Sequence, residues 1–202
     1  MPIVSKDFSN GRSVSGIWKI SETEEELLEI YTPGNLDLEL LQKTSSEKRK
    51  REILATRALI KKLGLNIIIS YNGRRPVSNK GYISISHSFD FVCVIWHPEK
   101  KVTIDIEKIS NRILNIAKRA FSEYELNFAG NNLKDLTILW NCKECIFKLA
   151  NDDGIEFKEQ IRVHPFGISD TIQCDLYNHK NTVKFNFNWS EIEDYTYVWG
   201  II

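Results

Sequence analysis

Two nearby segments with different periodicity, residues 102–107 and residues 139–149, constrain the fold of this chain most strongly. In the first segment apolar and polar side chains alternate, which predicts a strand with one buried face. Asp105 and Glu107 then stand side by side on the other face of that strand. The sequence therefore places two carboxylates together on one strand.

The second segment has the periodicity of an amphipathic helix. Its apolar residues recur on one stripe and are expected to face the core: Leu139, Cys142, Ile146 and Leu149. Residues at a spacing of four form a different stripe, with Lys143 and Phe147 beside it: Trp140, Glu144 and Lys148. This helix therefore presents a carboxylate and lysines on a face of its own.

If that stripe faces the strand, three carboxylates and at least one lysine converge. Two like charges about 4 Å apart repel by about 4 kcal/mol at an effective dielectric of about 20, so such a cluster requires a cation or shifted protonation. Oxygen ligands in this number suit Mg²⁺, which also binds substrate phosphates. Two simpler interpretations are open: Asp105 and Glu107 on a solvated strand face, and Glu144 with Lys148 as an ordinary surface pair.

Composition places the chain among soluble globular proteins. It has 202 residues, enough for one large or two small domains, of which 42% are hydrophobic and 27% charged. Lys plus Arg and Asp plus Glu each number 27, so the net charge is zero, which argues against a nucleic-acid partner. No signal peptide and no membrane-spanning run is recognised, and we expect a cytoplasmic protein without a membrane partner.

The four cysteines lie within apolar runs, which argues against a disulfide framework. Cys142-x-x-Cys145 fits either a metal or redox pair, or two buried structural residues. A second such pair is missing from the sequence, which favours the structural interpretation.

Other segments predict the remaining elements. Ser21 is expected to cap a helix over residues 22–30 with Glu24 completing a capping box, and a basic helix is expected over 48–63. Further strands are expected over residues 16–20, 82–87, 89–96, 155–163, 171–177, 182–188 and 195–202, and a helix over 112–121 followed by a helix capped at Ser122. The short loop 97–101 predicts an antiparallel hairpin between the strands that flank it.

Several motifs occur in a fixed order between Arg49 and Lys148. They are Gly73-Arg74-Arg75-Pro76, Ile85-Ser86-His87-Ser88, Ile104-Asp105-Ile106-Glu107, Phe121-Ser122-x-x-Glu125 and Trp140-x-x-Lys143-Glu144-x-x-x-Lys148. In this order they resemble the signature of the 4′-phosphopantetheinyl transferase superfamily, in particular the two-domain, surfactin-synthetase-activating type.

The resemblance implies an α+β fold, a pseudo-dimer of two similar α+β lobes with the active site in the cleft between them. The expected lobes are residues 1–100 and residues 101–202, with the metal-binding motifs in the second. The chain is expected to be a monomer.

The resemblance also implies a reaction. Such an enzyme transfers the 4′-phosphopantetheine moiety of coenzyme A to a serine of an apo acyl or peptidyl carrier protein, depends on Mg²⁺ and releases 3′,5′-ADP. Two alternatives are open: a non-catalytic coenzyme A or nucleotide-binding module, and a Mg²⁺-dependent phosphohydrolase.

By the same resemblance, individual residues receive roles. Metal ligands are expected at Asp105, Glu107 and Glu144, and catalytic roles at Glu144, Lys148 and His87. Coenzyme A is expected to contact Arg57, Arg75, Arg74, Ser86, His87, Lys143 and Lys148. Within this set Arg57 is expected to bind the 3′-phosphate, either Arg74 or Arg75 replaces the lysine of the family motif, and Lys118 and Arg119 are candidate contacts for an acidic carrier.

The chain departs from the family pattern at Thr103, which occupies the position of a glycine, and in the irregular Gly-Arg-Arg-Pro loop. On the surface of the basic helix, Arg49 and Arg51 are expected to be solvated.

Overall fold

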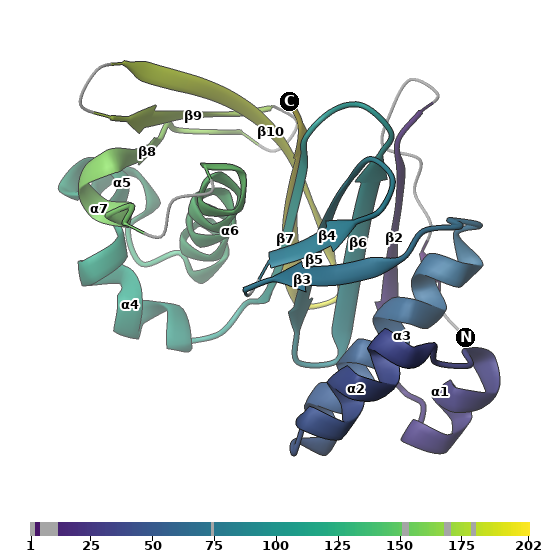
Figure 1. Cartoon of the computed structure of the whole chain (residues 1–202). Coiled ribbons are helices and arrows are strands. Elements are labelled where there is room, and N and C mark those ends of the chain that lie inside the picture. Colours follow the sequence, from purple (N-terminus) through teal and green to yellow (C-terminus); the bar gives the residue numbers. More distant parts are fainter. Residues whose placement is uncertain (1–2, 5–11, 74, 151–153, 168–170, 179–180) are drawn as a thin grey trace. The chain divides into compact units, whose positions relative to one another are not determined.

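The computed structural model describes residues 3–4, 12–73, 75–150, 154–167, 171–178 and 181–202 (Figure 1). The chain divides into two compact units, Met1–Lys100 and Lys101–Ile202. Each unit combines helices with antiparallel sheet, so the expected mixed α+β class is confirmed. Within the described residues, no helix is both long and apolar enough to cross a membrane.

The first unit is built on a four-stranded antiparallel sheet in the order β1-β2-β6-β5. Its strands are β1 (Ile3–Val4), β2 (Val14–Lys19), β5 (Tyr82–Ser88) and β6 (Phe91–His97). A separate hairpin pairs β3 (Ile69–Asn72) with β4 (Arg75–Ser78). Its helices are α1 (Glu24–Ile30), α2 (Asn35–Lys43) and α3 (Glu47–Lys62), and α3 packs against β2 and β6.

A glycine allows the close approach of α3 to the sheet. A Cβ atom on Gly16 would lie 3.0 Å from a methyl carbon of Leu59 and 3.1 Å from one of Leu63. Because Gly16 has no side chain, these two leucines pack directly on the backbone of β2.

The second unit is built on a five-stranded antiparallel sheet in the order β7-β11-β10-β9-β8. Its strands are β7 (Val102–Lys108), β8 (Ile161–Val163), β9 (Ile172–Tyr177), β10 (Thr182–Ile192) and β11 (Tyr195–Ile201). Its helices are α4 (Arg112–Ala120), α5 (Glu123–Ala129), α6 (Leu133–Ala150) and α7 (Phe157–Gln160). The long helix α6 lies against β7 and β11 (Figure 1).

The two units share a strand order. In each, the first long strand pairs with the last strand, which pairs with the strand before it in the chain, giving β2-β6-β5 and β7-β11-β10. In each, a long helix from between these strands packs on the first and the last of them, α3 in one unit and α6 in the other.

Most of the predicted elements are present, with local corrections. The first helix is capped by Thr23, which forms a capping box with Glu26, and not by Ser21. Glu22 accepts hydrogen bonds from the backbone N–H of Ser21 and from Trp18 Nε1, so it lies outside the helix. Two candidate caps with correctly spaced glutamates occur in this sequence, and the hydrogen bonds of Glu22 to Ser21 and Trp18 favour the second.

Two further predictions are wrong. The strands that flank residues 97–101 do not form a hairpin, because β6 pairs with β2 and β5 whereas β7 pairs with β11. Residues 155–163 form a strand only at Ile161–Val163, since Phe157–Gln160 is a short helix. In addition, the helix Asn35–Lys43 occupies a segment for which the sequence pattern predicts no helix or strand.

Candidate functional site

The polar face of β7 is turned toward α6. Thr103 and Asp105 are buried although they lie on the polar side of the strand. Thr103 Oγ1 donates a hydrogen bond to the backbone oxygen of Cys145 on α6, at 3.0 Å. The solvated strand face considered above is therefore not observed for Asp105, and Glu107, two residues further on, is half-buried.

Lys148 on α6 is paired with the first of the two acidic residues of β7. Its Nζ lies 2.7 Å from Asp105 Oδ1 and 2.8 Å from the backbone oxygen of Ile104. Asp105 is thus held by an ammonium group in a poorly solvated environment, where a charge-assisted hydrogen bond is stronger than in water.

Glu144, one helical turn before Lys148, shares this environment. The pKa of Glu144 is raised to about 7: burial makes the largest contribution, the negative charges of Asp105 and Glu107 add to it, and Lys148 opposes the shift. Three carboxylates and one ammonium therefore interact within the second unit. This is the arrangement expected if the polar stripe of the helix faces the strand. A carboxylate with a pKa near neutrality can accept or give up a proton under physiological conditions.

This shift predicts a pH-dependent stability. Because the pKa of Glu144 is higher in the folded protein, its contribution to the free energy of unfolding is fully present below about pH 4.5 and is lost as the pH rises through about 7. We expect wild type to lose about 2–3 kcal/mol relative to Glu144→Gln between about pH 4 and about pH 8, measured by urea unfolding in the presence of a chelator. Titrating groups that do not interact with Glu144 cancel in this difference, so parallel curves for the two proteins would contradict the shift.

These carboxylates have the right chemistry for a hard cation. Across the described ranges, no three His, Cys, Asp or Glu side chains are already arranged to hold a metal ion. The best candidates for oxygen ligands are Asp105, Glu107 and Glu144. Their carboxylates lie close enough to interact, because the negative charges of Asp105 and Glu107 both raise the pKa of Glu144. A divalent cation would relieve this mutual repulsion.

Lys143 does not share the environment of Glu144 and Lys148, which corrects its expected contact with coenzyme A. It is fully buried, and its Nζ lies 3.0 Å from Glu125 Oε1, 2.7 Å from the Phe157 oxygen and 2.6 Å from the Ile161 oxygen. All three donors of the ammonium are therefore used inside the second unit. A helical step of about 100° from Glu144 turns this side chain away, and Lys143 joins α6 to α5, α7 and β8.

In the first unit, the predicted site residue His87 lies against α3. Arg49 Nη1 contacts His87 Nε2, and His87 Nδ1 lies 3.6 Å from Glu52 Oε2. Arg49 also pairs with Glu52 at 3.0 Å, and Glu52 is buried. The expectation that Arg49 is merely solvated is therefore wrong, and the signal that could have revealed this cluster is the acidic Glu52 next to Ile53 and Leu54.

The remaining predicted residues of the first unit are dispersed. Ser86 on β5 is buried, as are Ser84 and Ser88 on the same side of the strand. Arg75 is half-buried at the start of β4, whereas Arg74 lies outside the described residues, so the choice between the two arginines stays a prediction.

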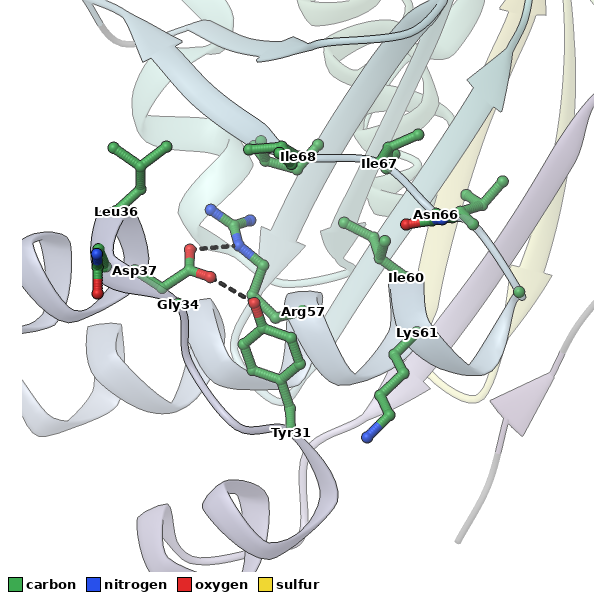
Figure 2. A pocket seen from close by; sticks show the side chains of 14 residues that line it. Tyr31, Gly34, Leu36, Asp37, Arg57, Ile60, Lys61, Asn66, Ile67 and Ile68 are labelled. Carbon is green, nitrogen blue, oxygen red and sulfur yellow. Dashed lines mark hydrogen bonds and ion pairs between the residues drawn. The ribbon is translucent and has the colours of Figure 1, made fainter.

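Arg57 lies apart from His87 within the first unit. It lies eight residues, or about 12 Å along the helix axis, beyond Arg49, and it is paired with Asp37 on α2 at 2.7 Å. A cavity lies beside this pair, and Arg75, Ser86 and His87 are not among the described residues that line it (Figure 2).

Two other expectations concern the second unit. Lys118 and Arg119 are exposed in the last turn of α4, where a partner could reach them. Cys142 and Cys145 are fully buried, which agrees with a structural role for this pair.

The scan against protein-family models found no match to the chain, and the search of curated proteins found none either. The arrangement of the residues described above is therefore the basis for any functional conclusion.

Proposed function

We propose that this protein is a 4′-phosphopantetheinyl transferase that moves the phosphopantetheine arm of coenzyme A onto a serine of an apo carrier protein. The observation that carries the proposal is the convergence of Asp105 and Glu107 on β7 with Glu144 and Lys148 on α6. Apart from Lys143, these are the acidic and basic residues of the two motifs that resemble the superfamily, and they interact although they are about forty residues apart in the chain.

The common strand order of the two units supports the corresponding fold, a pseudo-dimer of two similar α+β lobes. Both β2-β6-β5 and β7-β11-β10 place the last strand between the first strand and the strand before it in the chain. A duplicated unit would produce this repeated order together with the equivalent positions of α3 and α6.

Mg²⁺ would be held by Asp105, Glu107 and Glu144. The electrostatic repulsion among these carboxylates fits this role, because a bound cation would relieve it. When bound, the ion would supply positive charge to the phosphate oxygens of coenzyme A. Thr103, at the position of the family's glycine, donates its hydroxyl to the backbone oxygen of Cys145, so this hydroxyl would not compete with the metal for these carboxylates.

The residues of the chain would then act on the substrates directly. In the transfer, the serine oxygen of the carrier forms a bond to the β-phosphorus of coenzyme A, the bond from this phosphorus to the bridging oxygen breaks, and 3′,5′-ADP leaves with the electron pair. Glu144, whose pKa of about 7 suits proton transfer, accepts the serine proton directly or through water. Lys148 stabilises the negative charge that gathers on the phosphate oxygens.

The first unit would contribute phosphate-binding groups. His87 and Ser86 belong to the motif that resembles the family's phosphate contact, and Arg49 extends this set because it touches His87. Glu52 would orient both Arg49 and His87, and Arg75 or Arg74 would add a further cation. An acidic carrier protein would meet the exposed Lys118 and Arg119.

The decisive experiment is intact-protein mass spectrometry of apo acyl and peptidyl carriers incubated with the protein, coenzyme A and Mg²⁺. We expect a phosphopantetheine adduct on the carrier, lost when a chelator removes the metal. Phosphopantetheine released without an adduct would identify a phosphohydrolase instead. Binding of coenzyme A without either product, across several carriers, would reduce the protein to a binding module and refute transfer.

A further inference from the structure

The first unit contains a cavity that the proposed transfer does not use. Its volume is about 580 Å³, within the usual range for small-molecule sites, and it lies between α2, the second half of α3 and residues 64–69 (Figure 2). Its wall is largely hydrocarbon, contributed by Leu36, Ile60, Leu65, Ile67 and Ile68. A site of this composition favours a ligand with an apolar body.

The floor of this cavity is a buried polar network. Arg57, only 4% exposed, donates from Nε to Asp37 Oδ1 at 2.7 Å. The Tyr31 hydroxyl donates to Asp37 Oδ2 at 2.5 Å, and burial together with this hydrogen bond raises the pKa of Tyr31 to about 12. Asp37 is therefore satisfied by two donors, and Tyr31 remains a neutral donor at physiological pH.

The other end of the Arg57 guanidinium is unsatisfied. Nη1 and Nη2 are both buried, and neither has a hydrogen-bond partner in the part of the chain that is described. Each buried donor without a partner costs about 1–3 kcal/mol. The two nitrogens form a fork that matches the two oxygens of a carboxylate, and they point into the space between Leu36 and Ile68 (Figure 2).

The side chains in front of this fork can give way. Leu36 and Ile68 are 53% and 59% exposed, so they have little packing to hold them in one position. Rotation of either side chain about its own bonds would open the fork to a ligand from solvent, and the same two side chains would then cover the ligand's hydrocarbon part.

The charges that line the cavity indicate the charge of the ligand. Arg57 and Lys61 line the cavity as cations and Asp37 as an anion, so these side chains leave one positive charge in excess. Lys61 is exposed and its Nζ donates to the Ile30 oxygen at 3.0 Å. A monoanion would make the site neutral, whereas a dianion such as a phosphate monoester would leave a buried negative charge.

We propose that this cavity binds a small monocarboxylate with a hydrocarbon body, its two oxygens accepting from Arg57 Nη1 and Nη2 and its body lying on Leu36, Ile60 and Ile68. The proposal replaces the expected contact of Arg57 with the 3′-phosphate of coenzyme A. It does not rest on the proposed transferase activity, because Arg57 is the one cavity-lining residue that was expected to contact coenzyme A, and the other residues assigned to coenzyme A or to the metal are not among the described residues that line the cavity.

Sodium octanoate is a suitable probe, titrated into the full chain and followed by isothermal calorimetry and by the methyl resonances of isoleucine. We expect saturable binding at one site, with the largest shifts at Ile60, Ile67 and Ile68. Acetate lacks the hydrocarbon, octan-1-ol lacks the carboxylate, and inorganic phosphate lacks the hydrocarbon and carries more charge. Each of these three should bind at least about tenfold more weakly than octanoate, or about 1.4 kcal/mol.

Two variants on one helix provide a matched pair. Leu36→Gln places a polar group against the ligand body and should weaken octanoate binding at least about tenfold. Leu38→Gln is the control, because Leu38 is 44% exposed on the same helix but does not line the cavity, and its affinity should equal that of wild type. Arg57→Lys keeps the charge but removes the fork, and it should also lose binding in protein that circular dichroism shows to be folded.

Several outcomes would overturn the proposal. They are the absence of saturable octanoate binding, equal affinity for octan-1-ol, tighter binding of phosphate, and equal effects of Leu36→Gln and Leu38→Gln. None of them bears on carrier modification, which the mass spectrometry tests separately.

Discussion

Glu144→Gln is expected to lower the rate of phosphopantetheine transfer by about 10²–10⁴-fold, the usual contribution of a positioned general base. The substitution keeps the shape of the side chain but removes both its proton affinity and one of the three carboxylates that influence one another at β7 and α6. The measurement is the initial rate of adduct formation on an apo carrier at saturating coenzyme A and Mg²⁺.

The matched control is Glu123→Gln, because Glu123 is exposed on α5 and has no proposed role in metal binding or catalysis. It should transfer at the wild-type rate. Unchanged turnover in Glu144→Gln would refute the role of this residue, and a matching loss in Glu123→Gln would reveal a non-specific effect.

Lys143→Met is expected to lower the free energy of unfolding by about 3–5 kcal/mol, the range for breaking one partner of a buried ion pair. The change leaves the fully buried Glu125 without its cation and the backbone oxygens of Phe157 and Ile161 without the ammonium donor. Burial lowers the pKa of Lys143 and Glu125 opposes this shift, which shows that the pair and its desolvation act against each other. The measurement is urea unfolding near neutral pH.

Lys118→Met, at an exposed position of α4, is the control and should lose little stability. The double variant Lys143→Met with Glu125→Gln should be less destabilised than the sum of its single variants, because the uncompensated charge is removed. A loss for Lys143→Met no larger than that of the control would show that Lys143 is not a structural residue, and would restore it as a candidate contact for coenzyme A.

Local patterns predicted much of this architecture. The alternation in β7 and the 3.6-residue period of α6 identified both elements, and the spacing of Asp105, Glu107, Glu144 and Lys148 indicated which side chains share a face. Capping at Ser122 was also predictable, since Ser122 and Glu125 form a capping box. These predictions succeed because side-chain direction within one element follows from backbone geometry alone.

The features that the sequence did not predict all depend on contacts between different helices and strands. The cluster of Arg49, Glu52 and His87 joins residues up to 38 positions apart, and no local period specifies that partnership. Lys143 and Glu144 are neighbours in sequence, yet one is fully buried against Glu125 and the other faces Asp105. The wrongly predicted hairpin at residues 97–101 has the same cause, because a short loop permits pairing but does not require it.

By itself, the sequence determined the class of the fold, the main helices and strands, and the residue types and spacing that suggest metal-dependent phosphate chemistry. Only the tertiary structure decided that Lys148 pairs with Asp105, that Lys143 is a buried structural cation, and that Arg57 opens onto a cavity with Asp37. The reason is that charge, burial and unsatisfied hydrogen bonds are properties of a side chain's surroundings, and those surroundings are assembled from segments far apart in the chain.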